Sequence, residues 1–413
     1  MIRVNWPRRV LWATCVFLVP CFGYAQSSKW NTWLTTQIQQ HPDIIAAHKQ
    51  LLSNNANAKA AEQPLYNPEI STEVERNGSD DNFLVGVQQT IDWWDKQELK
   101  QQQANYLKAE AEAIYQQQVL DKMAQALNAL IEWHFASRVS AITRTQQQQL
   151  NALLELAQKR QQAGDLGSVD AELAFLSLSQ QLAQVAEVDV ALQKAQFRVR
   201  ELLPEWAPER GGIPTDFWPT TLGVVSDQEL LKHPTVASTH ASWQSLKEEA
   251  KVVQRAAKAE PTIGINAGRD SDKNVVALSF SIPLNVRNNF SAETQAAESR
   301  VLEAEARFRA AFRKQHFDSQ AAYNTWQTYT QQYQHWQTVA QSRVKDSAQL
   351  LKRQWSSGDL STSNYLQALH QRAESLLAGI ELEKQTQHAL TEVLQQSGRL
   401  NIMTIPTIST TNQ

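Results

Sequence analysis

Apolar residues recur at alternating spacings of three and four along two long stretches of the chain, residues 96–163 and 287–357. This alternation is typical of coiled-coil helices, which pack through one apolar seam. About 70 residues, at a rise of 1.5 Å each, form a rod of roughly 100 Å. A turn that contains glycine follows each stretch, and a shorter helix is predicted to return over 168–203 and 361–398. The pattern therefore predicts two long antiparallel helical hairpins.

Two short segments, 69–92 and 261–284, alternate apolar and polar residues on either side of a polar turn. A period of two around such a turn is typical of a β-hairpin. The apolar positions of the returning strands are Phe83, Val85, Val87 and Ile91 in the first segment, and Val276, Leu278, Phe280 and Ile282 in the second. Strands of about nine residues are long enough to cross a bilayer when they are tilted. We therefore expect four strands of membrane-spanning length.

The two halves of the chain repeat each other. His41-Pro42 recurs 192 residues later as His233-Pro234, and Gly164-Asp165-Leu166 recurs 194 residues later as Gly358-Asp359-Leu360. Landmarks that keep their order and spacing in this way indicate a tandem duplication of about 190 residues.

Each repeat is predicted to contain a leading helix, a β-hairpin, a long helix and a return helix. The leading helices are expected over 30–62 and 227–259. The predicted divisions of the chain are a first repeat over 26–210, a linker over 211–226, a second repeat over 227–400 and a C-terminal tail over 401–413.

The first 25 residues have the pattern of a secretory signal peptide. Three arginines precede an apolar core of ten residues, and Gly23-Tyr24-Ala25 supplies small residues at the positions that a signal peptidase reads. Lipoprotein processing at Cys21 is the alternative, although Pro20 beside it matches that signal poorly. Because Cys15 and Cys21 are the only cysteines, we expect an exported protein without a disulfide framework or a cysteine metal site.

Composition and motifs exclude several classes of function. A formal net charge of −3 argues against a nucleic-acid binder, because such proteins neutralise phosphates with basic residues. The sequence has no P-loop, metalloprotease motif or nucleophile elbow, so we predict that the chain is not an enzyme and needs no cofactor. The histidine pairs His41/His48 and His233/His240 are each seven residues apart, a poor spacing for chelation, and no metal site is expected.

Four strands cannot close a β-barrel on their own, because the smallest closed barrels use about eight. An open strand edge in lipid would leave backbone groups unpaired, so the chain is expected to form oligomers. A dimer supplies eight strands, and side chains would fill the interior of so small a barrel. A trimer supplies twelve strands and leaves a pore. The predicted fold is therefore mainly α, with antiparallel coiled-coil helices forming an α-barrel and four strands per chain contributing to a trimeric 12-stranded β-barrel.

These elements together resemble the TolC-like outer-membrane efflux proteins. The resemblance rests on the two His-Pro helix starts, the strand entries Asn67-Pro68 and Glu260-Pro261, and the strand exit Ser281-Ile282-Pro283-Leu284. It also includes two helical tips. The first tip carries Arg160, Gly164 and Asp170, and the second carries Arg353, Gly358 and Asn364, where the family often has Asp. In size the chain is nearest to the cation-efflux (CzcC-like) branch.

The resemblance implies a homotrimer in the outer membrane whose helical tube extends into the periplasm. It also implies that the tips close the periplasmic end, with Asp165, Asp170, Asp359 and Asn364 at the gate. Arg160, Gly164, Arg353 and Gly358 would dock a periplasmic adaptor protein, which links the duct to an inner-membrane pump of the resistance-nodulation-division or another class. Three copies of Asp170 in a narrow mouth would favour cations. The alternative for Asp165 and Asp359 is that each caps the following helix.

Two further expectations concern aromatic residues and the transported substrate. Trp93 and Trp94, at a junction between strand and helix, are expected to contact the inner lipid interface, with ordinary packing as the alternative. The size of the chain favours efflux of heavy-metal cations over drugs, other organic compounds or type I secretion. A periplasmic coiled-coil adaptor or scaffold is the more distant alternative, and the two apolar hairpins argue against it.

Overall fold

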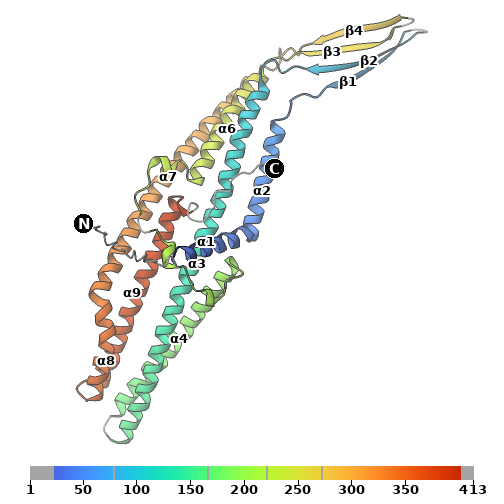
Figure 1. Cartoon of the computed structure of the whole chain (residues 1–413). Coiled ribbons are helices and arrows are strands. Elements are labelled where there is room, and N and C mark those ends of the chain that lie inside the picture. The colour runs from blue at the N-terminus through green and yellow to red at the C-terminus, as the bar shows by residue number, and fades with distance from the viewer. Residues whose placement is uncertain (1–22, 78–79, 165–166, 220–221, 271–272, 401–413) are drawn as a thin grey trace, which may run out of the picture.

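The computed structural model describes residues 23–77, 80–164, 167–219, 222–270 and 273–400. These residues form a long rod of helices with a four-stranded sheet at one end and two helical tips at the other (Figure 1). Residues 1–22 of the predicted signal peptide and the whole predicted tail, 401–413, lie outside the described residues. The arrangement confirms a mainly helical fold with four strands.

Both predicted helical hairpins are present. In the first, α3 (Lys96–Gln162) descends to a tip and α4 (Ser168–Leu202) returns beside it. In the second, α7 (Ser291–Trp336), a π-helical turn labelled η3 (Gln337–Gln341) and α8 (Ser342–Ser356) descend, and α9 (Thr362–Gln396) returns. The sequence predicts one continuous α-helix for the second rod, and this prediction is wrong. The rod carries one π-helical turn, an irregularity that periodicity does not reveal.

The leading helices are also shorter than predicted. The stretch 30–62 contains two helices, α1 (Gly23–Gln40) and α2 (Pro42–Ala61), and 227–259 contains α5 (Asp227–Leu230) and α6 (Pro234–Ala256). In each repeat a His-Pro pair makes the break, because proline lacks the N–H that a helix interior needs and therefore starts a new helix. The histidine ring caps that helix: Nδ1 of His41 accepts from the Asp43 N–H, and Nδ1 of His233 accepts from the Thr235 N–H.

The strands form one antiparallel sheet in the order β1-β2-β3-β4. The bounds are β1 Glu69–Asn77, β2 Asp80–Thr90, β3 Thr262–Asp270 and β4 Lys273–Ser281. The two hairpins join through β2 and β3, where Val85 pairs with Ala267 and Thr90 with Thr262. The central pairing thus connects the two repeats, and one strand of each repeat lies at an edge.

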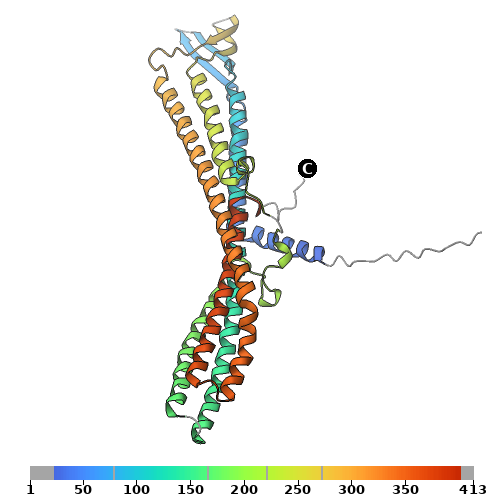
Figure 2. The same ribbon diagram turned by 90° about the vertical axis from the view of Figure 1, so that its left-hand side faces the viewer.

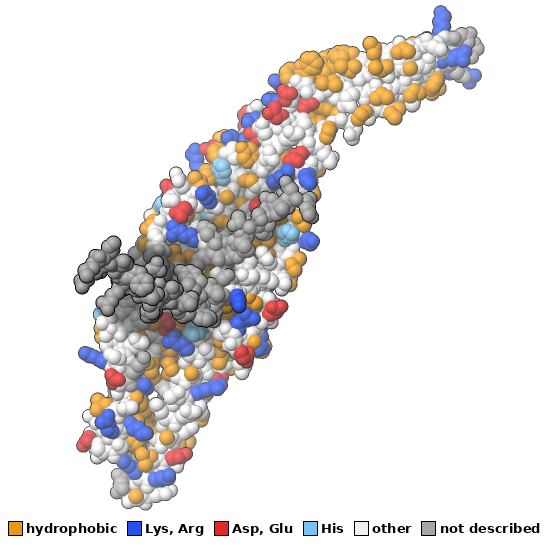
Figure 3. All heavy atoms as spheres, in the orientation of Figure 1, with side chains coloured by type: hydrophobic (Ala, Val, Ile, Leu, Met, Phe, Trp, Pro, Cys, Tyr) orange, Lys and Arg blue, Asp and Glu red, His pale blue; other side chains and the backbone are white. Residues whose placement is uncertain are grey.

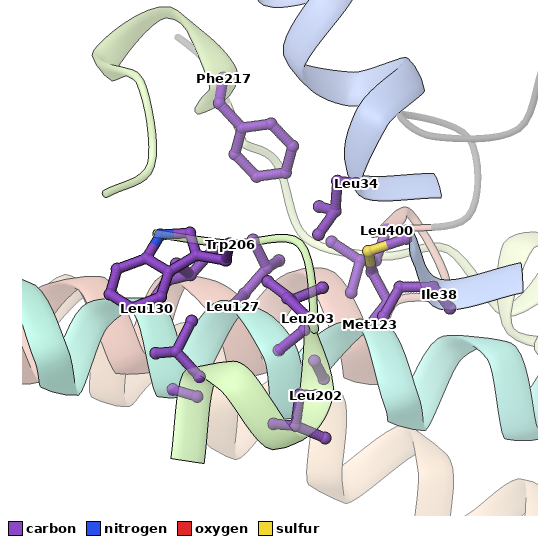
Figure 4. Packing of buried hydrophobic residues seen from close by; sticks show 14 of the residues in the cluster. Leu34, Ile38, Met123, Leu127, Leu130, Leu202, Leu203, Trp206, Phe217 and Leu400 are labelled. Carbon is purple, nitrogen blue, oxygen red and sulfur yellow. The ribbon is translucent and has the colours of Figure 1, made fainter. Parts of the chain in front are cut away.

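The largest hydrophobic core lies at the waist of the rod, where α1 crosses it (Figure 2). Figure 4 shows side chains of α1, α3, the end of α4, the linker and the segment after α9 converging there: Leu34, Ile38, Met123, Leu127, Leu130, Leu202, Leu203, Trp206, Phe217 and Leu400. The segment between the repeats therefore does more than connect them. Two 3-10 turns, Pro208–Arg210 and Thr215–Phe217, hold it against α3.

Candidate functional site

The sheet has one continuous apolar face. The strand register aligns Ile70 with Val87, Val87 with Ile265 and Ile265 with Leu278, so that every second side chain lies on the same side. In the single chain these side chains are exposed, up to 80% for Leu278, and Figure 3 shows hydrophobic atoms gathered over the strands. The exposed apolar residues of this face are Ile70, Val74, Phe83, Val85, Val87, Ile263, Ile265, Val276, Leu278 and Phe280. A patch of this continuity is typical of a surface that lipid or another protein covers.

The opposite face of the sheet is polar. Gln88 donates to the Glu69 carboxylate over 2.9 Å, and the Ser71 hydroxyl donates to the Asn266 side chain over 3.3 Å. Within the described chain the outer edges of β1 and β4 have no strand partner. A sheet with one apolar face, one polar face and two free edges matches one arc of a barrel that separates lipid from water.

A buried ion pair joins the two repeats where the sheet meets the rods. Lys96 Nζ of α3 lies 2.6 Å from Glu260 Oε2 just before β3, and the two residues are only 9% and 7% exposed. The Tyr66 hydroxyl donates to the same Glu260 oxygen and accepts from Lys96 Nζ over 2.8 Å. Sequence reasoning missed this network, because nothing in the local pattern shows that residues 164 positions apart meet.

The charges at this junction are held by their partners. Burial opposes ionisation of Lys96, but its bonds to Glu260 and Tyr66 outweigh that effect and raise the pKa of the ammonium group. Burial likewise opposes ionisation of Asp92, yet the N–H groups of Gln97 and Lys96 donate to its carboxylate and lower its pKa. Asp92 thereby satisfies two donors in the first turn of α3.

The two tryptophans after β2 have different surroundings. Trp93 is 64% exposed, whereas Trp94 donates from Nε1 to the Ala259 carbonyl over 2.9 Å and lies under Lys258 Nζ, 4.4 Å from the ring centre. The packing alternative therefore describes Trp94. Contact with the lipid interface stays a prediction for both residues.

Arg160 links the two helical tips. Its guanidinium lies over the Trp355 ring, 5.2 Å from the centre, and donates to the Ser356 carbonyl over 3.1 Å. Trp355 is buried and stacks on Tyr365 with ring centres 5.1 Å apart. Its Nε1 donates to the Thr362 hydroxyl over 3.3 Å. The first tip is thus held to the second by a contact between residues 195 positions apart.

Three of the predicted gate residues, Asp170, Asp359 and Asn364, lie at the tips, and the described residues show no hydrogen bond or ion pair between them. Asp165 lies outside the described residues, and Asp170 is in the first turn of α4. Asp359 accepts from the Ser357 hydroxyl over 2.6 Å. The N-cap of α9 is Ser361, whose hydroxyl accepts from the Asn364 N–H, so the alternative that Asp359 caps this helix is wrong.

The remaining predicted tip residues include the two glycines that end the descending helices. Gly164 and Gly358 have φ values of 82° and 84°, the left-handed conformation that favours glycine after a helix. A Cβ at either position would meet nothing within 4 Å, so backbone conformation and not crowding requires glycine there. Arg353 is exposed near the end of α8.

Other kinds of site are not apparent in the described part of the chain. The described residues contain no group of three or more His, Cys, Asp or Glu side chains that could hold a metal ion. None of the helices in the described ranges is long and apolar enough to cross a membrane.

The architecture of this chain is found in solved structures of other proteins. No protein-family model matches the chain, and no curated protein matches its sequence. Solved structures do match it over nearly its whole length. CusC superposes with a TM-score of 0.75 at 14% identity, covering 90% of this chain and 92% of its own. The CmeC outer membrane channel of Campylobacter jejuni superposes with a TM-score of 0.74 at 13% identity, covering 91% and 87%. The outer membrane protein VceC of Vibrio cholerae gives 0.72 at 16% identity, covering 91% and 96%.

The chain has the fold of the TolC-like channels. The resemblance that the sequence suggests is therefore confirmed for the fold, including the helical rods and the four-stranded sheet at one end. At 13–16% identity the similarity concerns architecture, and the function of this chain has to be argued from its own residues.

Proposed function

We propose that this TolC-like chain is the outer-membrane exit duct of a tripartite efflux system. In this role it passively conducts substrates to the exterior from an inner-membrane pump and a periplasmic adaptor, and it catalyses no reaction. The two-faced sheet with open edges carries the proposal, because such a sheet is stable in lipid only when further copies close it into a barrel. The rod that follows the sheet (Figure 1) would extend the duct into the periplasm.

The assembly proposed is a homotrimer. Three copies of a four-stranded sheet supply twelve strands, enough for a barrel with an open lumen. The apolar face would contact outer-membrane lipid, and the polar face with Gln88 and Asn266 would line the pore. Trp93, exposed just beyond β2, would lie at the inner lipid interface.

The tips are proposed as the periplasmic gate and the adaptor-docking site. Asp170 and Asn364 belong to the first turns of α4 and α9, and three copies of Asp170 around the axis would attract cations. Asp165 and Asp359 would add to this charge. Docking is proposed at Arg160, Gly164, Arg353 and Gly358, and the pump is of the resistance-nodulation-division or another class.

Heavy-metal cations are the proposed substrate class. The size of the chain supports this choice, and organic compounds or secreted proteins are the alternatives. We expect a deletion strain to lose tolerance to zinc, cobalt, cadmium or copper while keeping tolerance to a panel of drugs and dyes. Unchanged metal tolerance would remove the cation assignment and leave the duct itself unaffected.

The duct is tested by separating the two membranes of cells that express the full chain. We expect the protein in the outer-membrane fraction. In mild detergent its protein mass, corrected for bound detergent, should be roughly 130 kDa. This is the mass of three chains of 46.7 kDa each after their signal peptides have been removed. A soluble periplasmic monomer or dimer would instead support the coiled-coil scaffold.

A further inference from the structure

A cavity of about 300 Å³ lies in the half of the rod nearer the sheet, where α6 packs between α3 and α7 (Figure 1). All three helices supply side chains to its wall. Ligand sites of small organic molecules have volumes of roughly 300–1,000 Å³, so this cavity is large enough for a small ligand.

The cavity contains a carboxylate without a cationic partner. Glu110 of α3 is half-buried and forms no ion pair with any other described residue. Burial raises the pKa of its carboxyl group, and a hydrogen bond with Ser242 of α6 opposes that shift. An ionisable group that burial perturbs within a cavity is a candidate for ligand binding.

The other charged residues of the wall already have partners. Arg300 of α7 lies 2.9 Å from the Glu249 carboxylate. One turn further along the same helix, Glu303 and Arg307 pair with each other over 2.6 Å. The charge that a ligand would neutralise in this cavity is therefore that of Glu110.

The hydroxyl groups of α6 leave acceptors facing the cavity. Ser238 and Thr239 line it, and both donate their hydroxyl hydrogen to the Thr235 carbonyl, over 3.0 and 3.2 Å. A hydroxyl has one hydrogen to donate and two lone pairs that accept. With the hydrogens engaged by the helix backbone, the two hydroxyl oxygens and the Glu110 carboxylate act as acceptors, and the ligand has to supply the donors.

The rest of the lining that these helices supply is apolar. Ile114 lies one turn after Glu110 on α3, Leu246 lies on α6, and Ala304 is buried on α7. A ligand that fits this wall carries a positive charge, several hydrogen-bond donors and a short apolar body. A divalent metal ion fits it less well, because such ions take six or more oxygen ligands and the cavity offers one unpaired carboxylate.

We propose that this cavity binds a small primary amine in its protonated form. The ammonium group, with three donors and no acceptor, donates to the Glu110 carboxylate and to the hydroxyl oxygens of Ser238 and Thr239. Its carbon chain lies against Ile114 and Leu246. The site is built within a single chain and does not depend on the proposed duct.

Three matched probes test the chemistry of the site. The full-length protein, in non-ionic detergent and an amine-free phosphate buffer, is titrated calorimetrically with n-butylamine, 1-butanol or butyltrimethylammonium chloride. We expect saturable binding of n-butylamine and at least about tenfold weaker binding of the other two, because the alcohol lacks the charge and the quaternary ion lacks the donors. Equal binding of the three probes, or no saturable binding of n-butylamine, overturns the proposal.

Two variants and a control locate the site. Glu110→Gln should weaken n-butylamine binding at least about tenfold, and Thr239→Val about threefold, because a charged hydrogen-bond partner contributes more than a neutral one. Glu112→Gln makes the same change two residues along α3, at an exposed side chain outside the lining, and should leave the affinity unchanged. Equal affinities in Glu110→Gln and Glu112→Gln would contradict binding in this cavity.

Unfolding separates ligand binding from a structural role of the carboxylate. Without ligand, Glu110→Gln should unfold at the same or a higher denaturant concentration than the unchanged protein, because it removes a half-buried charge that has no partner. Added n-butylamine should raise the midpoint of the unchanged protein and not that of Glu110→Gln. A lower midpoint for Glu110→Gln without ligand would make the carboxylate structural and contradict the proposal. None of these outcomes changes the membrane fraction or the mass of the complex, on which the duct is tested.

Discussion

The two long rods come from one duplicated sequence, yet they have different roles in the chain. The first rod, α3, is a single helix that buries large apolar side chains, among them Leu120, Leu127 and Phe135. In the second rod, the buried residues of α7 are small or polar, namely Ala297, Ala304, Gln315, Ser319 and Ala322. Two large apolar side chains of α7, Leu302 and Phe317, are 66% and 56% exposed.

This difference follows from position. The rod α3 packs against α2, α4, α6 and α9, so it is the spine around which one chain folds. In contrast, α7 packs mainly on α6 and α9 and turns its remaining surface outward. Duplication therefore supplied two rods of similar length, of which the first packs on more neighbours within the chain and the second leaves more of its surface uncovered. The predictions below test this division.

The largest effect is expected where the two repeats join. Replacing Lys96 with methionine leaves the buried Glu260 carboxylate without its cation, and such a change costs about 3–5 kcal/mol. We expect a lower midpoint of denaturant unfolding for the detergent-extracted complex and a smaller yield in the outer membrane. The double variant Lys96→Met with Glu260→Met should recover most of the loss, because no buried charge then remains unpaired.

An ion pair on the second rod gives the control. Arg307 and Glu303 on α7 are 2.6 Å apart, but their side chains are 74% and 58% exposed. Such a pair contributes at most about 0.5 kcal/mol, so Arg307→Met should leave the unfolding midpoint nearly unchanged. Equal losses in Lys96→Met and Arg307→Met would show that the junction network does not stabilise the chain.

The next effect compares one leucine from each rod. Leu127→Ala removes a fully buried side chain from the waist core and should cost about 3 kcal/mol in the free energy of unfolding. Leu302→Ala removes an exposed side chain and should cost less than about 0.5 kcal/mol in the separated chain. Chemical unfolding of the dissociated chain and of the intact complex would measure both. A cost for Leu302→Ala that appears only in the complex would place this residue at a contact between copies.

The sequence predicted the elements whose information is local. The period of two in Phe83, Val85 and Val87 predicted a strand, and the spacing of Leu120, Met123 and Leu127 predicted a coiled-coil seam. The duplication added the comparison between repeats, and together these patterns were sufficient for the fold. Helix ends were less accurate, because proline after His41 starts a new helix within an otherwise continuous helical pattern.

The parts that sequence reasoning missed depend on contacts between distant residues. Lys96 and Glu260 meet only because β2 and β3 pair, and Arg160 meets Trp355 only because the two tips end at one level. The resemblance to the TolC-like proteins suggested Arg160 for adaptor docking, which stays a prediction, whereas its neighbours show that it joins the two tips. The π-helical turn is the same kind of case, since it lies where the second rod contacts α9, a helix distant in the sequence.

A smaller effect is expected at that π-helical turn. Trp336, the last residue of α7, packs against Gly379 of α9, and a Cβ built on this glycine would lie 2.2 Å from the indole ring. The residues 194 positions earlier are Ile142 and Val185, so the corresponding positions of the first repeat carry two side chains of moderate size, whereas those of the second carry a large side chain and none. Gly379→Ala should cost about 1–3 kcal/mol in the free energy of unfolding, because it forces the ring to move.

The double variant Trp336→Ile with Gly379→Val gives the second repeat the side chains of the first. We expect it to unfold at a higher denaturant concentration than Gly379→Ala, because the smaller side chain leaves room for the added one. If the double variant is no more stable than Gly379→Ala, contact between these two residues does not explain the packing at this level.

The smallest effect depends on pH and compares the two histidine caps. Burial lowers the pKa of His233 below 6.5, against the opposing effects of the Gln395 carbonyl and Asp121, and its Nδ1 must be unprotonated to accept from Thr235. The unfolded chain therefore takes up the proton first. The stability that His233 supplies is complete above about pH 6.5 and falls as the pH drops below it, by at most about 1.4 kcal/mol per pH unit.

His233→Asn keeps a capping side chain but removes the titration. Unfolding midpoints at pH 7.5 and 5.5 should therefore differ less in His233→Asn than in the unchanged protein. His41 caps α2 in the same way, and burial followed by Lys122 lowers its pKa while Asp43 opposes the shift. Because His41 is less buried than His233, His41→Asn should change the pH dependence less. Equal changes in the two variants would mean that the two histidine caps contribute alike to the pH dependence of stability, although the rods that follow them pack differently.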